Sequence, residues 1–159
     1  MAISNISYNY VGRKKDISIL QAATPLIKDR QIVSPEFGST VKFCAGVQKL
    51  IQKYAIILLT NINSQGNFTE FGTSLIFNLK TGITPIDKIS IAQLFSLASY
   101  QAVNTLLSYQ AENPDIPEDE QISTAYLKDL VISKDSVAFD IAITTVSGNT
   151  VPFLIPLPE

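Results

Sequence analysis

The sequence contains no histidine, no tryptophan and a single cysteine, Cys44. Histidine is the commonest general base near neutral pH and the commonest transition-metal ligand. Its absence therefore excludes Ser/His/Asp and Cys/His catalytic centres, and ordinary zinc sites, built within this chain. One cysteine cannot form an intramolecular disulfide, so nothing indicates an oxidising compartment. Between Phe43 and Ala45, Cys44 is expected to be a small buried apolar residue.

Charged residues are also scarce: they make up 16% of the 159 residues, whereas hydrophobic residues make up 46%. The usual charged fraction is about a quarter, so we expect part of the apolar surface to face other proteins. The net charge of −2 is scattered, without a basic face for nucleic acid. No apolar run is long enough to cross a bilayer, and residues 1–10 lack a secretory pattern. We therefore expect assembly in a cytoplasm, with no nucleic acid or membrane as partner.

Ligand-binding motifs are missing too. The glycines fall in neither the P-loop nor the dinucleotide spacing, and the acids at 115–120 lack the spaced ligands of a calcium loop. We expect no cofactor, no metal and no small-molecule ligand. One enzymatic class, glycoside hydrolysis, needs only two carboxylates, and Glu70 with Glu112 or Glu118 would supply them. Because aromatic and amide groups for sugar binding are few, we interpret these carboxylates as surface residues and assign no catalytic residue.

Hydrophobic periodicity predicts two main helices. Apolar residues recur at helical spacing between 45 and 60, and a polar loop follows. The second helix is expected to start at Ser90, with Gln93 completing a capping box, and to end near 109–111 before Pro114. Its predicted core stripe is Ile91, Leu94, Phe95, Ala98, Ala102, Leu106 and Tyr109.

The segments around these helices are expected to be irregular. Residues 68–89 are predicted to form a loop with one turn, at Phe71-Gly72-Thr73. Three acids after Pro117 suit the N-terminus of a short helical turn. The basic run Arg13-Lys14-Lys15 is interpreted as part of a solvated arm. Residues 1–44 show strand pieces without a clear helix, which favours an extended N-terminal arm ahead of an α+β domain over 45–159.

From residue 126 the hydrophobic period becomes two. It predicts strands over 127–132, 137–144 and 151–155, with Ser147-Gly148-Asn149 as the turn between the last two. The predicted fold class is α+β, with two main helices packed on a small, mostly antiparallel C-terminal sheet and an extended N-terminal arm.

The last strand contains prolines, at Pro152, Pro156 and Pro158. Proline has no amide hydrogen to donate, so this strand is expected to lie at an edge of the sheet. The remaining unpaired backbone groups of such an edge can pair with another chain. The alternative is that the prolines merely protect the edge against aggregation, and the sequence leaves the two open.

Three short stretches carry a resemblance to a known family. They are GVQKLIQK at 46–53, Leu58-Leu59-Thr60 and FGTSL at 71–75. Together with the order of elements over roughly 45–157, they resemble the small wedge subunit, or sheath initiator, of contractile phage tail baseplates. In that family a helix ending in a leucine-leucine-threonine step leads to a loop, a glycine-centred turn, a second helix and a C-terminal β-hairpin. The family is sometimes labelled lysozyme-like.

The resemblance implies a structural, non-enzymatic protein of the virion, located in the tail baseplate. The implied partners are the tail sheath protein, other baseplate wedge proteins and the tail tube. The C-terminal strands would join a sheath subunit by strand exchange, which carries over to Val137, Phe139, Ile141, Val151, Phe153 and Ile155.

A departure from the family lies after the second helix. Members often carry a Glu-Pro-Arg motif there that docks on the wedge bundle, whereas this chain has no arginine nearby. Its corresponding docking residues would be Tyr109, Glu112 and Pro114. The alternative function is a free-standing cytoplasmic binding adaptor with an exposed sheet edge. An adaptor stays soluble and dissociable, whereas a baseplate subunit remains in purified particles at fixed stoichiometry.

Overall fold

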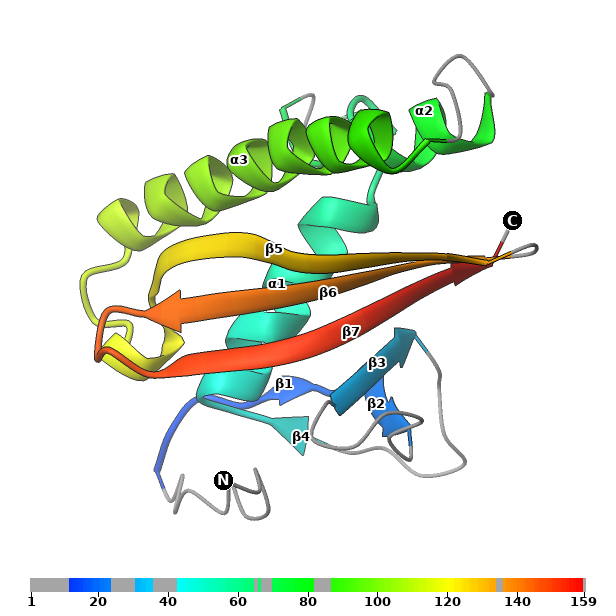
Figure 1. Ribbon diagram of the computed structural model, residues 1–159. Helices are drawn as coiled ribbons and strands as arrows, with labels where there is room; N and C mark the ends of the chain where they lie inside the picture. The colour runs from blue at the N-terminus through cyan, green and yellow to red at the C-terminus, as the bar shows by residue number, and fades with distance from the viewer. Residues whose placement is uncertain are drawn as a thin grey trace.

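The computed structural model describes residues 12–23, 31–35, 43–64, 66, 70–81, 87–133 and 136–158. The fold is α+β, as predicted (Figure 1). In the described residues, no helix combines the length and apolar character needed to cross a membrane. The elements are β1 (Asp16–Ile17), β2 (Leu20–Ala23), β3 (Gln31–Pro35), β4 (Phe43–Cys44), α1 (Val47–Leu59), α2 (Leu75–Lys80), α3 (Lys88–Glu112), the 3₁₀ turn η1 (Glu118–Glu120), β5 (Ile122–Ser133), β6 (Ser136–Thr145) and β7 (Thr150–Pro158).

The main sheet has five strands in the order β2-β3-β7-β6-β5. The C-terminal strands β5, β6 and β7 form an antiparallel meander, the small sheet that the alternating pattern predicts. The hairpin β2-β3 extends it, with β3 parallel to β7. A separate two-stranded ribbon joins β1 to β4. In Figure 1 the strands β5, β6 and β7 lie side by side, and β2 and β3 lie beyond β7.

Both long helices pack on one face of the meander. From α1, the ring of Tyr54 meets Phe153 of β7 edge-on, with centroids 6.2 Å apart. From α3, Phe95 stacks on Phe139 of β6 at 5.0 Å. These aromatic side chains are almost completely buried, and such pairs contribute beyond the area they bury. The core therefore lies between the two helices and the helix-facing residues of β6 and β7.

The start of α3 differs from the predicted capping box. The N-cap residue is Asp87, whose carboxylate accepts a hydrogen bond from the Ser90 amide at 2.8 Å and from the Ser90 hydroxyl at 2.6 Å. These two bonds lower the pKa of Asp87. Ser90 is thus the third helical residue and not the cap. Aspartate and serine are about equally good caps, so residue type alone does not distinguish Asp87 from Ser90.

Two other expectations need correction. The region 68–89 contains a short helix, α2, where a loop was predicted. In the predicted stripe of α3, Tyr109 is 42% exposed and Leu94 only partly buried, whereas the other members are buried. Tyr109 is therefore a surface residue and not part of the core.

Candidate interaction surfaces

The turn between β6 and β7 fixes which backbone groups of β7 point outward. The amide of Thr145 donates to the Asn149 carbonyl at 2.9 Å, and the amide of Gly148, at a φ of +85°, donates to the Thr145 carbonyl at 3.0 Å. Successive residues of an antiparallel ladder alternate between bonded and non-bonded positions. Odd-numbered residues of β7 therefore direct their amides at β6. The three even-numbered prolines occupy positions whose nitrogens face away from β6.

That outward side of β7 is not an edge, contrary to the prediction. The strand β3 pairs with it in parallel, in the register Gln31↔Phe153 and Ile32↔Leu154. This pairing falls between Pro152 and Pro156, where Leu154 is the residue that still has an outward amide hydrogen. The prolines thus indicate correctly which side of β7 has few amide hydrogens to donate. A short strand, β3, nevertheless pairs with that side between Pro152 and Pro156.

The outermost described strands of the five-stranded sheet are β2 and β5. The edge strand β5 has register shifts between Ile122 and Thr124 and between Leu127 and Asp129, and such bulges disturb regular pairing with a further strand. At its start, Ile122 bonds through both backbone groups to the side-chain amide of Gln110 on α3, at 2.6 and 3.2 Å. A side chain therefore takes the place of a neighbouring strand there.

The predicted strand-exchange residues lie in the core of the protein. Val137 and Val151 are 7% exposed, and the other four are 0–1% exposed. Their side chains pack against the helices, so a partner that adds to β7 would meet its backbone and not these side chains. The four are Phe139, Ile141, Phe153 and Ile155.

The described part of residues 1–44 folds back on the domain. Gln52 of α1 is buried, and its side-chain amide bonds the Ile17 carbonyl at 2.9 Å and the Ile19 amide at 2.8 Å. The neighbouring ribbon pairs Asp16 with Cys44. Cys44 is buried as predicted, and burial followed by the Asp16 charge raises the pKa of its thiol.

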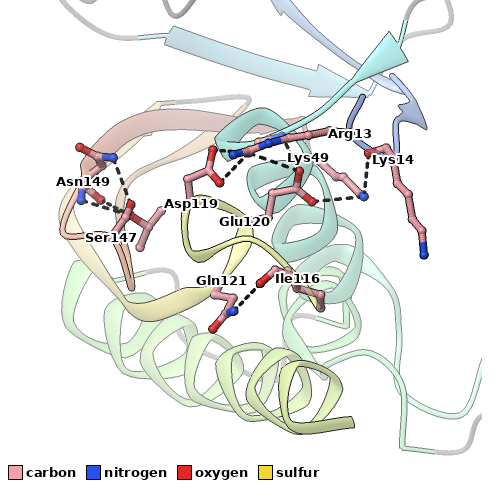
Figure 2. A network of polar contacts seen from close by, with 11 residues as sticks. Arg13, Lys14, Lys49, Ile116, Asp119, Glu120, Gln121, Ser147 and Asn149 are labelled. Atoms are coloured by element: carbon pink, nitrogen blue, oxygen red, sulfur yellow. Dashed lines mark hydrogen bonds and ion pairs between the residues drawn. The ribbon is translucent and has the colours of Figure 1, made fainter. Parts of the chain in front are cut away.

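A cluster of charged side chains fastens the same segment to η1 (Figure 2). Arg13 donates from Nη1 to both carboxylate oxygens of Asp119, at 2.6 and 2.7 Å. Lys49 of α1 lies 3.2 Å from the carboxylate of Glu120 and donates to the Lys14 carbonyl at 3.2 Å. The three acids after Pro117 form the short helical turn that the sequence predicts. Asp119 and Glu120 in addition bind basic residues of two other segments, which the sequence did not indicate.

Within this cluster, Glu120 also serves the start of α1. The helix begins after Gly46 without a side-chain cap of its own. The Glu120 carboxylate accepts a hydrogen bond from the Gly46 amide at 2.9 Å, and a negative charge at a helix N-terminus is favourable. The side chains of Glu120 and Lys49 are only 6% and 9% exposed. Each buried charge thus depends on the other for compensation.

Two of the stretches that carry the family resemblance touch each other. The Thr73 amide donates to the Thr60 carbonyl at 2.8 Å, and the Thr73 hydroxyl donates to the Leu58 carbonyl at 2.7 Å. Between them Gly72 adopts a φ of +108°, and a Cβ there would lie 2.5 Å from the Thr60 carbonyl oxygen. The leucine-leucine-threonine step and the glycine turn therefore form one joint at the end of α1, which requires glycine at 72.

The predicted docking residues lie around the end of α3. Tyr109 borders a cavity of about 320 Å³ between α1 and α3, and the ammonium of Lys53 lies 4.4 Å from the centre of its ring. The rest of the lining is almost entirely apolar. Glu112, the last residue of α3, and Pro114, just after it, are exposed but do not line this cavity.

The carboxylates considered for glycoside hydrolysis are exposed on separate elements: Glu70 before the glycine turn, Glu112 at the end of α3 and Glu118 in η1. Among the described residues, no three acidic or cysteine side chains gather closely enough to hold a metal ion. Comparison with models of known protein families, with curated protein sequences and with solved structures gave no match for this chain.

Proposed function

We propose that this protein is a structural subunit of a contractile phage tail baseplate, which joins the inner wedge to the first sheath ring through β-strand exchange. The observation that carries the proposal is the outward side of β7, which is paired with β3 over a window of only two residue pairs. An added strand gains affinity from backbone hydrogen bonds. The strand β3 belongs to the same chain and pairs with β7 at only two positions, so we expect a strand of another protein to displace it.

The joint at the end of α1 supports the family assignment. The resemblance rests on a leucine-leucine-threonine step and a glycine turn that are distant in sequence. Thr60 and Thr73 bond directly, and the backbone at Gly72 leaves no room for another residue. Gly72 and the Thr73 hydroxyl have structural reasons for their residue types, which makes the joint a better basis for resemblance than apolar residues in a helix.

The exchange acts through the backbone of β7. A sheath strand would take the place of β3, with Leu154 as donor and the carbonyls of β7 as acceptors. The buried residues Phe153 and Ile155 hold β7 against the helices and so keep this backbone extended. Tyr109, together with Glu112 and Pro114, is proposed to contact the other wedge proteins, and the tail tube is a further neighbour.

The matched variants Leu154→Pro and Leu154→Ala test the exchange. Both remove the leucine side chain, but only proline removes the outward amide hydrogen. Proline suits this strand because positions 152 and 156, with the same orientation, are already proline. Baseplates carrying Leu154→Ala are expected to assemble sheath normally, whereas those carrying Leu154→Pro should assemble little or none, as counted by electron microscopy.

The measurement distinguishes two failures. Normal sheath on Leu154→Pro baseplates would refute strand exchange at β7. The stoichiometry of the chain in purified particles, measured by mass spectrometry, tests the baseplate assignment itself. A chain that washes out of the particles would support the dissociable adaptor instead. Circular dichroism of both variants checks that the three-stranded meander still forms.

A further inference from the structure

The cavity between α1 and α3, with a volume of about 320 Å³, draws its walls from three places in the sequence. They are Lys53, Ile56 and Ile57 of α1, Phe71 of the glycine turn, and Thr105, Leu106 and Tyr109 of α3. The Thr105 hydroxyl already has a partner, because it donates to the Gln101 carbonyl of its own helix at 3.0 Å. Since these parts are far apart in the chain, no sequence motif indicates the cavity, and a small-molecule ligand was not expected from the sequence.

The size of the cavity suits a small molecule. An apolar cavity of roughly 150 Å³ holds one benzene molecule, and ligand pockets begin at about 300 Å³. A phenylalanine or leucine side chain inserted by another protein is close to benzene in size, so it would fill only about half of the space. Water would find few hydrogen-bond partners between these walls. The cavity therefore fits an apolar body of about two fused rings, or an acyl chain of about ten carbons.

The opening of the cavity carries a positive charge. Ile57 and Leu106 are only 4% and 3% exposed, so they line its inner end, whereas the exposed Tyr109 lies where it meets solvent. The Lys53 ammonium lies 4.4 Å from the centre of the Tyr109 ring and hence at the same opening. Over the part of the chain that the structure describes, this ammonium forms no ion pair. An aromatic ring attracts a cation without neutralising it, so Lys53 is available to a carboxylate.

We propose that this cavity binds a free amphiphilic carboxylate, a small molecule with an apolar body and one acidic head group, of the class to which medium-chain fatty acids belong. The apolar body lies between Ile57 and Leu106, and the carboxylate pairs with Lys53 at the opening. The charge of Lys53 determines that the ligand is an anion. The volume and the apolar walls determine that it is a small molecule with an apolar body.

The inference does not rest on the baseplate proposal. Strand exchange uses the backbone of β7 on its outward side, whereas the cavity lies between the two helices. Tyr109 is common to the cavity and to the proposed contact with wedge proteins. Ligand binding is measured on the isolated chain and sheath assembly on baseplates, so each can fail without the other.

Isothermal titration calorimetry with decanoate, below the concentration at which it forms micelles, tests the proposal on the purified chain. We expect one site per chain and weaker binding of decanol, which has the same number of carbons but no charge. Lys53→Met keeps an unbranched apolar side chain and removes the ammonium. It should raise the Kd of decanoate at least about tenfold and leave that of decanol nearly unchanged. Lys128→Met, which changes an exposed lysine of β5, is the matched control and should bind decanoate as the wild type does.

Two further measurements test the position of the site. Thr105→Phe places a larger side chain on the wall of the cavity and should abolish the binding of both compounds, with an unchanged circular dichroism spectrum. Methyl NMR of the wild type locates the site without any substitution. Decanoate should shift the signals of Ile56 and Ile57 and leave that of Val131, toward the far end of β5, unchanged.

The proposal is overturned if the wild type does not bind decanoate, or if Val131 shifts as strongly as Ile57. Equal weakening by Lys53→Met and Lys128→Met would mean a non-specific attraction between charges, and Lys53→Met that binds decanoate like the wild type would mean that the ligand is not an anion. Either result also overturns it. A chain that ignores decanoate, but whose Thr105→Phe variant fails to enter baseplates, would assign the cavity to a side chain of another protein and so contradict the proposal.

Discussion

The two long helices cover the same face of the sheet, yet they have different surroundings. Nine of the 13 residues of α1 are buried, whereas only six of the 25 residues of α3 are. Helix α1 lies between the sheet, α3 and the N-terminal segment. Helix α3 covers the core with one face and leaves the other in solvent. The apolar residues of α1 therefore stabilise the fold of the monomer, whereas the apolar residues on the outside of α3 lie in solvent.

The polar residues of the two helices differ in the same way. On α1, the buried Lys49 and Gln52 bind Glu120 and the backbone near Ile17. They connect segments that are far apart in the sequence. On α3, the amide of Asn104 is exposed.

A buried pair of hydroxyl groups joins the two helices where they meet: the Tyr54 and Ser99 oxygens lie 2.8 Å apart. Burial raises the pKa of Tyr54, so this phenol stays neutral.

The largest effect should come from a leucine of α1. Leu58 is completely buried, so Leu58→Ala removes buried methyl groups and leaves a cavity. We expect a loss of about 2–5 kcal/mol in the free energy of unfolding. Urea denaturation followed by circular dichroism measures it. A loss below about 0.5 kcal/mol, the size typical of surface changes, would mean that α1 is not the central element of the fold.

A smaller loss is expected at the charged cluster. Glu120→Gln keeps an acceptor for the Gly46 amide but removes the charge that compensates Lys49. We expect a cost of about 1–3 kcal/mol, because Lys49 is left buried with less compensation. Glu118→Gln is the matched control, since this residue is exposed on the same turn. Equal stabilities of the two variants, measured by thermal unfolding, would show that the cluster does not stabilise the start of α1.

Local patterns predicted the helices and the C-terminal hairpin well. Helical spacing located α1 and α3, and alternation with Ser147-Gly148-Asn149 located β6, β7 and their turn. These elements have one face in the core, so their period is visible in the sequence. The alternation of β5 is broken by its bulges, so only 127–132 was predicted of a strand that begins at Ile122. Helix α2 has six residues, too few for a clear period.

Contacts between distant segments could not be predicted. The bonds between Arg13 and Asp119 span 106 residues, and nothing near either residue indicates the other. The prolines of β7 predict which backbone groups are missing, because proline lacks an amide hydrogen. They do not predict whether a strand such as β3 occupies the space. Phe153 was expected among the strand-exchange residues, whereas its side chain is buried, and its contact with Tyr54 depends on how α1 crosses the sheet.

The smallest loss of stability is expected from the same substitution, leucine to alanine, on the outer face of α3. Leu97 is 57% exposed, so Leu97→Ala should change the free energy of unfolding of the monomer by no more than about 0.5 kcal/mol. Urea denaturation followed by circular dichroism measures this difference. A loss as large as that of Leu58→Ala would mean that the outer face of α3 is covered within the monomer, and the contrast between the helices would be wrong.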